Sequence, residues 1–323
     1  MWTSPSISKP SRLPCGSSAA SPPCLPPTCV RRKFGAPKPQ PAAGAPAAST
    51  RRPFRWAARS DSPAGSSGNP SKNNLLKKRG VNNMQQERVL VVSAHALDFL
   101  WRCGGTIAKY TREGSTVRII NLTNGARGES NELWKKNPGI TAEQITAERK
   151  REAQQSSQMI GAEIQFMDWQ DHMLEPNLDR TLQLAREMMQ FNPTIILTHF
   201  TSDPMNPDHP TTAQMVIEAF RCAQTSGVFP GETPCGPAKI FMFEPAYPEV
   251  VGYVPDVYID ITDTMELKMK AMEAGGAQKV LAQAYDKRNG YRGHLASKLS
   301  GNKSIKYAET FQRFKPYVGD RFC

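Results

Sequence analysis

Two histidines and an aspartate occupy positions from which they could bind one metal ion. His95 follows a short apolar run, residues 89–92, and Asp98 comes three positions later. His209 stands in the sequence NPDH, shortly after a second apolar run at 194–199. Imidazole and carboxylate groups suit zinc, and a catalytic zinc site takes three protein ligands and keeps one position open. We therefore predict that His95, Asp98 and His209 bind Zn²⁺.

Ordinary structural roles compete with this prediction. His95 could be a buried, hydrogen-bonded histidine, and Asp98 could be a helix N-cap. Asp208 either orients a metal ligand or belongs to the turn after Pro207, and the sequence favours neither role. The remaining histidines are not assigned to the metal: His199 is expected in the core or at its rim, and His172 and His294 at the surface.

The hydropathy pattern predicts the elements that hold these residues. Apolar runs typical of strands cover 88–93, 117–122, 163–167, 194–199, 239–243 and 256–261, and helical periodicity covers 98–113, 143–160, 178–191, 210–225 and 263–285. Such alternation implies βαβ units with a mostly parallel sheet covered on both faces. We predict an α/β, Rossmann-like three-layer sandwich, with both candidate loops at the carboxyl edge of the sheet, where such folds bind ligands. Residues 286–323 are expected to form helix and loop packed over the site.

Charge is distributed unevenly along the chain, whose net charge is +12. Residues 1–83 contain 14 Lys or Arg and one acid, whereas the remainder contains 27 basic and 28 acidic residues. The basic character thus belongs to the first part, which removes the main argument for a nucleic-acid partner.

The first part of the chain differs from the rest in composition as well. Residues 1–83 are rich in Ser, Pro, Ala and Arg and lack periodicity, so we predict a disordered extension. It is interpreted either as an organelle transit peptide or as an untranslated segment, with Met84 as the true start. The catalytic domain is predicted to span 84–323.

Cysteine usage and hydropathy bear on the compartment. The seven cysteines form no C-x-x-C pair, which is ordinary for a reducing compartment and predicts no disulfide framework. No run reaches the roughly 18–20 apolar residues that a membrane span needs. We expect a cytoplasmic protein with a small-molecule polycarboxylate as its partner and no membrane or nucleic acid; the sequence leaves a homo-oligomer open.

Several motifs together resemble one enzyme family. VLVVSAH-x-x-D with GGTIA, then NGARGES, R-x-x-E followed by MIGA, and NPDHP look like the LmbE/PIG-L zinc-dependent superfamily over residues 87–265. Most members are N-acetylglucosamine-type deacetylases that read His-Pro-Asp-Asp, in which the first Asp is the catalytic base. Here the matching residues are His95-Ala-Leu97-Asp98: the ligand is kept, and the base is replaced by a leucine.

This departure affects the expected reaction, because amide hydrolysis needs a group that moves a proton from water to the leaving amine. One branch of the superfamily, the 4-oxalomesaconate hydratases of gallate degradation, is similar in this respect and also in H-x-x-DF-x-WR-x-GG, RGES, DHP, FEP and VPD. The resemblance implies a zinc-dependent hydratase. The alternatives are a zinc-dependent deacetylase of N-acetylglucosaminyl conjugates and a non-catalytic ligand-binding descendant.

Hydration of a conjugated double bond also needs a carboxylate to move a proton. Glu129, in the loop GARGES after the predicted strand 117–122, is our first candidate. The alternative roles are a solvated loop carboxylate or a residue at the start of a helix. Glu244, at the end of the strand 239–243, is the second candidate.

A polycarboxylate substrate requires fixed cations, and arginine pairs with carboxylates in a bidentate manner. Arg127 is the best-placed candidate, and Arg102 comes next. Asn206, where the deacetylases have histidine, is predicted to contact the substrate. Arg149 and Arg151 in the helix 143–160 are interpreted as surface charges.

Overall fold

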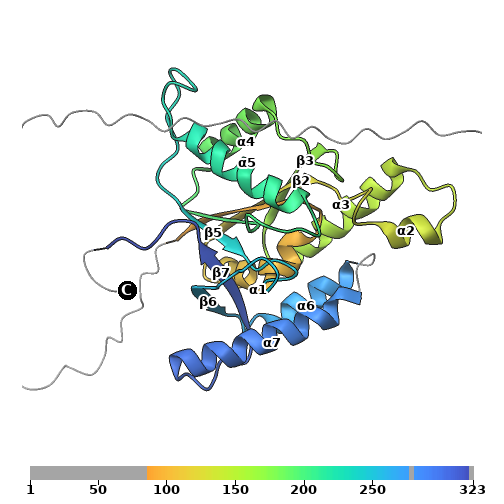
Figure 1. Ribbon diagram of the computed structural model, residues 1–323, viewed down its shortest axis with the longest axis vertical. Coiled ribbons are helices and arrows are strands. Elements are labelled where there is room, and N and C mark those ends of the chain that lie inside the picture. The colour runs from red at the N-terminus through yellow and green to blue at the C-terminus, as the bar shows by residue number, and fades with distance from the viewer. Residues whose placement is uncertain (1–85, 276–279, 320–323) are drawn as a thin grey trace, which may run out of the picture. The chain divides into compact units, whose positions relative to one another are not determined.

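The computed structural model describes residues 86–275 and 280–319 (Figure 1). All of them belong to a unit that spans Asn74–Cys323. The predicted basic extension, residues 1–83, lies outside the described ranges.

A single sheet of strands forms the centre of the described part, in the order β3-β2-β1-β4-β5-β7-β6. The strands are β1 (Arg88–Ser93), β2 (Thr116–Thr123), β3 (Glu163–Trp169), β4 (Ile195–Thr198), β5 (Lys239–Phe243), β6 (Val257–Asp260) and β7 (Ala308–Arg313). Strands β1 to β5 pair in parallel, and β7 runs antiparallel to both β5 and β6. The sheet is therefore mostly parallel, as predicted.

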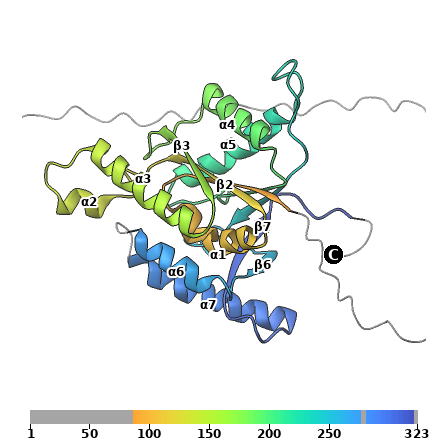
Figure 2. The same cartoon turned by 180° about the vertical axis from the view of Figure 1, so that it is seen from behind.

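Helices cover both faces of this sheet. They are α1 (Asp98–Arg112), α2 (Asn131–Lys136), α3 (Ala142–Met159), α4 (Leu178–Phe191), α5 (Asp208–Ala223), α6 (Met265–Ala274) and α7 (Val280–Ser300). Figures 1 and 2 show α4 and α5 together on one side, with α1, α6 and α7 on the other. The predicted three-layer α/β fold is confirmed.

The central strand β1 shows how the sequence builds these layers. Val89 and Val91 pack with α1, α3 and α6, whereas Leu90 and Val92 pack with α4 and α5. All four side chains are buried, because side chains alternate between the two faces of a strand and both faces of this sheet are covered. A nearly continuous apolar run is the expected sequence of such a strand.

The chain changes its direction of travel across the sheet at β1. From β1 the chain continues through α1 to β2 and later to β3, and it then returns through α4 to β4 on the other side of β1. Helix α1 follows β1 onto one face of the sheet, while α5 follows β4 onto the opposite face. The loops after these two neighbouring strands therefore diverge, and such a switch point is where open α/β sheets bind ligands.

Two predictions about the C-terminal part need correction. The helical pattern at 263–285 corresponds to two helices, α6 and α7, and residues 276–279 between them lie outside the described ranges. The segment 286–323, expected as helix and loop, also contains β7, which lies inside the sheet. The sequence AETFQR did not indicate a strand, because the buried residues Glu309 and Thr310 are polar and interrupt the apolar pattern.

Candidate metal centre

The three predicted ligands meet at the switch point between β1 and β4. His95 follows β1, Asp98 is the first residue of α1, and His209 is the second residue of α5. Asp98 Oδ2 lies 3.1 Å from His95 Nδ1 and 3.6 Å from His209 Nε2. All three residues are buried. The two loops, more than a hundred residues apart in the chain, therefore present their donor atoms to one point.

One ring nitrogen in this cluster has no hydrogen-bond partner within the described residues. His209 Nε2 is buried and makes no hydrogen bond, although His209 Nδ1 is 2.8 Å from Asp203 Oδ2. A buried polar atom without a partner is costly. Its position opposite a carboxylate and a second imidazole fits a divalent cation, because nitrogen and oxygen donors of this kind bind zinc.

Each of the two ligand histidines has a carboxylate at its second ring nitrogen. Asp203 contacts His209, as described above, and Asp208 Oδ2 lies 3.2 Å from His95 Nε2. Metal-bound histidines commonly have such a partner, which fixes the ring and its tautomer. Of the two roles left open for Asp208, the geometry favours the orienting one, with His95 rather than the adjacent His209 as its partner.

Asp208 is itself held by a strained loop. Its carboxylate accepts hydrogen bonds from the backbone amides of His172, Met173 and Leu174 at 2.7–3.1 Å. His172 and Met173 have φ values of 59° and 79°, a conformation that costs free energy in residues other than glycine. The His172 side chain is exposed, as predicted, and so is that of His294.

The carboxylates shift the pKa values of the imidazoles. Burial by itself lowers the pKa of His95, but its hydrogen bonds to Asp208 and Asp98 outweigh this effect and raise the pKa from 6.5 to about 10. Burial also opposes protonation of His209, whose pKa is raised by the charge of Asp98 and by Asp203. The pKa of Asp98 is lowered despite its burial, chiefly by the charge of His209. Without a metal, protons thus take the place of the cation.

His199 lies in the cluster although the sequence placed it outside the ligand set. Its ring stacks on that of His209 with a centroid distance of 4.2 Å, and its Nε2 is 3.4 Å from Asp98 Oδ2. The same Nε2 accepts the backbone N–H of Ala94 at 2.9 Å, which occupies its lone pair. Burial and the neighbouring His209 lower the pKa of His199 to about 3. This geometry favours a neutral histidine that supports the ligands.

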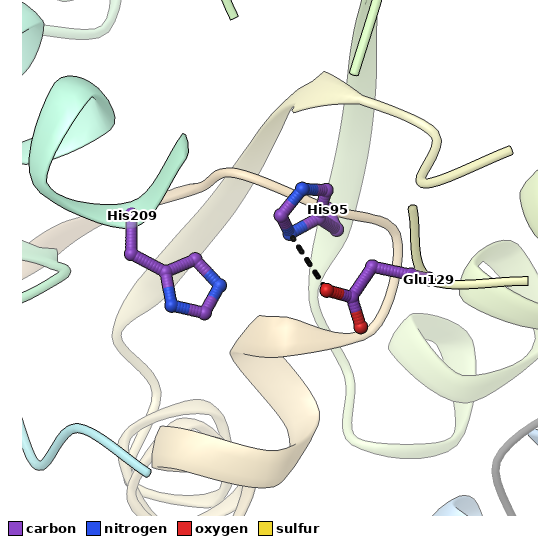
Figure 3. A group of neighbouring side chains, drawn as sticks. All are labelled: His95, Glu129 and His209. Carbon is purple, nitrogen blue, oxygen red and sulfur yellow. Dashed lines mark ion pairs between the residues drawn. The ribbon is translucent and has the colours of Figure 1, made fainter. Parts of the chain in front are cut away.

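Glu129 reaches the cluster from a different loop. Figure 3 shows its carboxylate pointing at His95, with Oε1 4.0 Å from His95 Nδ1, and the ring of His209 beside them. His95, Glu129 and His209 together could hold a metal ion, and so could Asp98, His199 and His209. Asn206 Nδ2 donates to Glu129 Oε1 at 2.6 Å, and Asn206 Oδ1 accepts the Asp208 N–H at 3.2 Å. Asn206 thus links Glu129 to the start of α5.

Leu97 lies beside the metal ligands without offering a polar group. It is 1% exposed and belongs to the apolar cluster below α1. A Cβ added at Gly275 would lie 2.7 Å from Leu97 Cδ1, so α6 ends against this side chain. The position adjacent to Asp98 is therefore part of the core.

The two predicted substrate-binding arginines lie in different places. Arg102 is buried, donates from Nη1 to the carbonyl oxygen of Glu244 at 2.9 Å, and has a buried Nε without a partner within the described residues. Burial opposes the charge of Arg102, but Tyr285, Asp98 and nearby carboxylates raise its pKa. Arg127 is exposed and lines a separate cavity of about 420 Å³ beside α3 and β3.

Glu244 is engaged in a bidentate ion pair. Its Oε2 accepts from Arg292 Nε at 2.9 Å and its Oε1 from Arg292 Nη2 at 2.8 Å. The hydroxyl of Thr310 also donates to Oε2. A carboxylate held by these donors is poorly suited to proton transfer, so the geometry favours Glu129 over Glu244.

The sequence did not indicate several residues of this region. Asp203 and Asp171 lie in sequences typical of ordinary turns. The Asp171 carboxylate nevertheless accepts hydrogen bonds from the backbone N–H groups of Arg127 and Gly128 and so holds the loop that carries Glu129. Arg149, expected at the surface, is fully buried and pairs with Glu152 at 2.7 Å. Arg151 is exposed, as expected.

Comparisons with known proteins agree with this architecture. The family described as GlcNAc-PI de-N-acetylase (PIG-L) matches residues 90–220. A 4-oxalmesaconate hydratase of Pseudomonas putida KT2440 is 34% identical, over 75% of this chain and 94% of that protein. A probable N-acetyl-alpha-D-glucosaminyl L-malate deacetylase of Bacillus anthracis is 29% identical, over 42% of this chain and 61% of its own length.

The crystal structure of GalB, the 4-carboxy-2-hydroxymuconate hydratase of P. putida KT2440, superposes with a TM-score of 0.71 at 33% identity, over 73% of this chain and 99% of GalB. An N,N'-diacetylchitobiose deacetylase of Pyrococcus horikoshii shares the fold, with a TM-score of 0.57 at 21% identity over 70% and 83% of the two chains. Within the described residues, no helix combines the length and hydropathy needed to span a membrane.

Proposed function

Because the chain belongs to the GlcNAc-PI de-N-acetylase (PIG-L) family, we propose that it uses the metal centre of this family for hydration of an unsaturated oxo-tricarboxylate. The substrate we propose is 4-oxalomesaconate, and the product is 4-carboxy-4-hydroxy-2-oxoadipate, as in the breakdown of gallate and protocatechuate. Relatives named as hydratases, 33–34% identical over most of the chain, support this choice.

The observation that carries the proposal is the buried Leu97. In the deacetylases that the sequence resembles, this position holds the carboxylate base, whereas here it holds an apolar side chain that is 1% exposed. The nearest carboxylate suited to proton transfer is Glu129, which comes from the loop after β2. Because the carboxylate that would donate and accept protons here lies in a different place from the base of the deacetylases, it suits a reaction other than amide hydrolysis.

The ligands of the proposed zinc ion are His95, Asp98 and His209. Zinc, when bound there, would polarise the carbonyl conjugated to the double bond and stabilise the negative charge that develops on its oxygen. Asp208 and Asp203 hold the two imidazoles so that His95 Nδ1 and His209 Nε2 face Asp98, where these residues would hold the ion. His199 supports His209 from its other face.

Hydration adds a hydroxyl group to one carbon of the double bond and a proton to the other. Glu129 accepts the proton of the attacking water and returns a proton to carbon. Asn206 holds the Glu129 carboxylate through Oε1, which leaves Oε2 directed away from this hydrogen bond. The backbone of this loop is fixed by Asp171.

The carboxylates of the substrate require positive charge. Arg102 is better placed than Arg127, because its charge acts on Asp98, Asp203 and Glu129 across the buried centre. Arg127 lies at an exposed position beside α3. We therefore assign a substrate carboxylate to Arg102, and Asn206 to the positioning of Glu129.

Incubation of the zinc-loaded protein with 4-oxalomesaconate tests the proposal. The expected result is loss of absorbance from the conjugated system, with formation of the hydroxy acid by mass spectrometry. The matched assay supplies an N-acetylglucosaminyl conjugate and measures acetate. Release of acetate without hydration would overturn the proposal and favour the deacetylase alternative. The names of the family and of the B. anthracis relative are the grounds for that alternative.

A further inference from the structure

Helix α1 is interrupted at Cys103, just beyond the segment that contributes to the metal centre. Cys103 has φ −143° and ψ 20°, whereas its neighbours are helical. The segment before this break carries Asp98 and Arg102, and the segment after it begins at Gly104 and Gly105. The direction of the first segment, and with it the position of the Asp98 carboxylate, therefore depends on what holds the break.

A buried ion pair replaces the hydrogen bond that the break removes. In an unbroken helix, the Gly105 N–H would donate to the Trp101 carbonyl oxygen. Here the Gly105 N–H donates to Glu309 Oε1 at 3.0 Å, and the Trp101 oxygen accepts from Lys268 Nζ at 3.0 Å. Glu309 Oε2 also accepts the Thr106 N–H at 2.7 Å. The carboxylate thus accepts two backbone N–H groups of the helix, and the ammonium donates to the Trp101 carbonyl oxygen.

The ion pair is complete and excluded from solvent. Lys268 Nζ lies 2.7 Å from Glu309 Oε1, and both side chains are 0% exposed. The third hydrogen of the Lys268 ammonium goes to Asn289 Oδ1 at 2.9 Å, and Asn289 donates in turn to the Ala308 oxygen at 3.1 Å. Because every donor of the ammonium is satisfied, the network is rigid and costly to break.

The network joins elements that are distant in the sequence. Lys268 comes from α6, Asn289 from α7 and Glu309 from β7. The residue after β6 also approaches α1 closely: a Cβ at Gly105 would lie 2.7 Å from Ile261 Cδ1, so this contact requires glycine at position 105. The C-terminal elements therefore contact α1 at the break, where its direction is set.

We propose that Glu309 and Lys268 are positioning residues of the metal centre, which hold the break in α1 and so fix the Asp98 carboxylate relative to His95 and His209. This inference rests on the metal site proposed above. The two residues act through the backbone of α1, so their removal changes the geometry of the ligand set while leaving every ligand in the chain.

The test compares Glu309→Gln with the unsubstituted full-length protein. The glutamine has the same size, but it leaves Lys268 without a counter-charge and cannot accept both amides with a charged carboxylate. We expect zinc affinity, measured by competition with a chromophoric chelator, to fall about tenfold, as for partners of metal ligands. The visible spectrum of the Co²⁺-substituted protein, which reports ligand geometry, should also change.

Met188→Ala is the matched control. Met188 is fully buried in the apolar cluster of α4 and α5, on the opposite face of the sheet. Its truncation leaves a cavity and lowers stability but should change neither zinc affinity nor the cobalt spectrum. If Glu309→Gln does not fold, Asn289→Ala removes a single hydrogen bond of Lys268, and a smaller loss of affinity is expected.

Two results would overturn the inference in distinguishable ways. Equal zinc affinity and identical cobalt spectra in the unsubstituted protein and the folded variant would reject the positioning role alone. Failure of the unsubstituted protein to bind zinc would reject the metal site and the inference together.

Discussion

The candidate ligands His95 and His209 differ from ordinary buried histidines in that the second ring nitrogen of each contacts a carboxylate. Asp208 contacts one and Asp203 the other, and each carboxylate leaves the opposite nitrogen directed at Asp98. The same carboxylates that would orient a metal ligand also stabilise a protonated imidazole. The metal-free centre is therefore expected to hold protons that zinc must displace.

Zinc binding should release protons, and the affinity should rise with pH. The pKa of His95 in the metal-free protein is raised from 6.5 to about 10, so this imidazole is protonated at pH 7 and must lose its proton to bind zinc. The competition weakens as pH rises and ends above about pH 10. Calorimetry in two buffers of different ionisation enthalpy measures the release. Buffer-independent binding heats would contradict the assigned ligands.

Glu129→Gln should retain zinc and lose most of the hydratase activity. The amide keeps the size and the hydrogen bond from Asn206 but cannot accept a proton, and general acid–base catalysis contributes about 10²–10⁴-fold to rate. Zinc content by atomic absorption and turnover of 4-oxalomesaconate are the two measurements. Glu132→Gln, at an exposed position in the following helix, is the control and should be fully active. A variant at position 129 with unchanged turnover would remove this carboxylate from the mechanism.

Individual residues were predictable where their place in a strand–loop–helix unit was visible. His95, Asp98 and His209 come together as expected, because each follows or begins an element whose pattern is clear. Asp203 and Arg149 could not be found in this way. Asp203 lies in an irregular loop, and the burial of Arg149 depends on packing that helical periodicity does not encode.

Most strands and helices with apolar patterns were predicted to within two residues, apart from the helix predicted at 263–285, whereas β7 was not predicted. Its buried polar side chains have specific partners: Glu309 binds the break in α1 and Thr310 binds Glu244. A hydropathy pattern reports burial of apolar surface, so a strand that buries polar groups remains hidden from it. The short helix α2, which has no buried residues, was missed for the complementary reason.

Gly105→Ala should destabilise the protein through the contact between α1 and the C-terminal elements. The added Cβ would lie 2.7–3.0 Å from three atoms of Ile261, and overpacking of this kind costs about 1–3 kcal/mol. Thermal unfolding followed by circular dichroism should show a lower Tm. Gly227→Ala is the control, because a Cβ there meets nothing within 4 Å. An unchanged Tm for the variant at 105 would mean that α1 and Ile261, which follows β6, can move apart without loss of stability.

The architecture as a whole was predicted from the alternation of strands and helices, and the motifs led to the correct family. The resemblance to the LmbE/PIG-L superfamily and its hydratase branch is confirmed by the relatives found. What the sequence could not supply is the order of the strands in the sheet. The placement of β7 between β5 and β6 depends on long-range pairing.

Removal of the metal should lower the stability of the whole described unit, because the proposed ligands join β1, α1 and α5. Zinc at about a thousand times its Kd would stabilise the folded protein by about 4 kcal/mol. For a chain of this size, that corresponds to a shift in Tm of roughly 10 °C. Calorimetry with and without a chelator measures it. His209→Ala should show no such shift, and an equal shift in this variant would place the ion elsewhere.

The late position of β7 bears on how the protein is made. Gly105 and Glu309 are separated by 204 residues, so a nascent chain exposes the first two ligands long before the strand that steadies them has been synthesised. Until then the sheet lacks β7, and the break in α1 lacks the Glu309 carboxylate. We therefore expect firm zinc binding only once residues 308–313 have joined the sheet, and a chain truncated before residue 308 should retain the ion poorly.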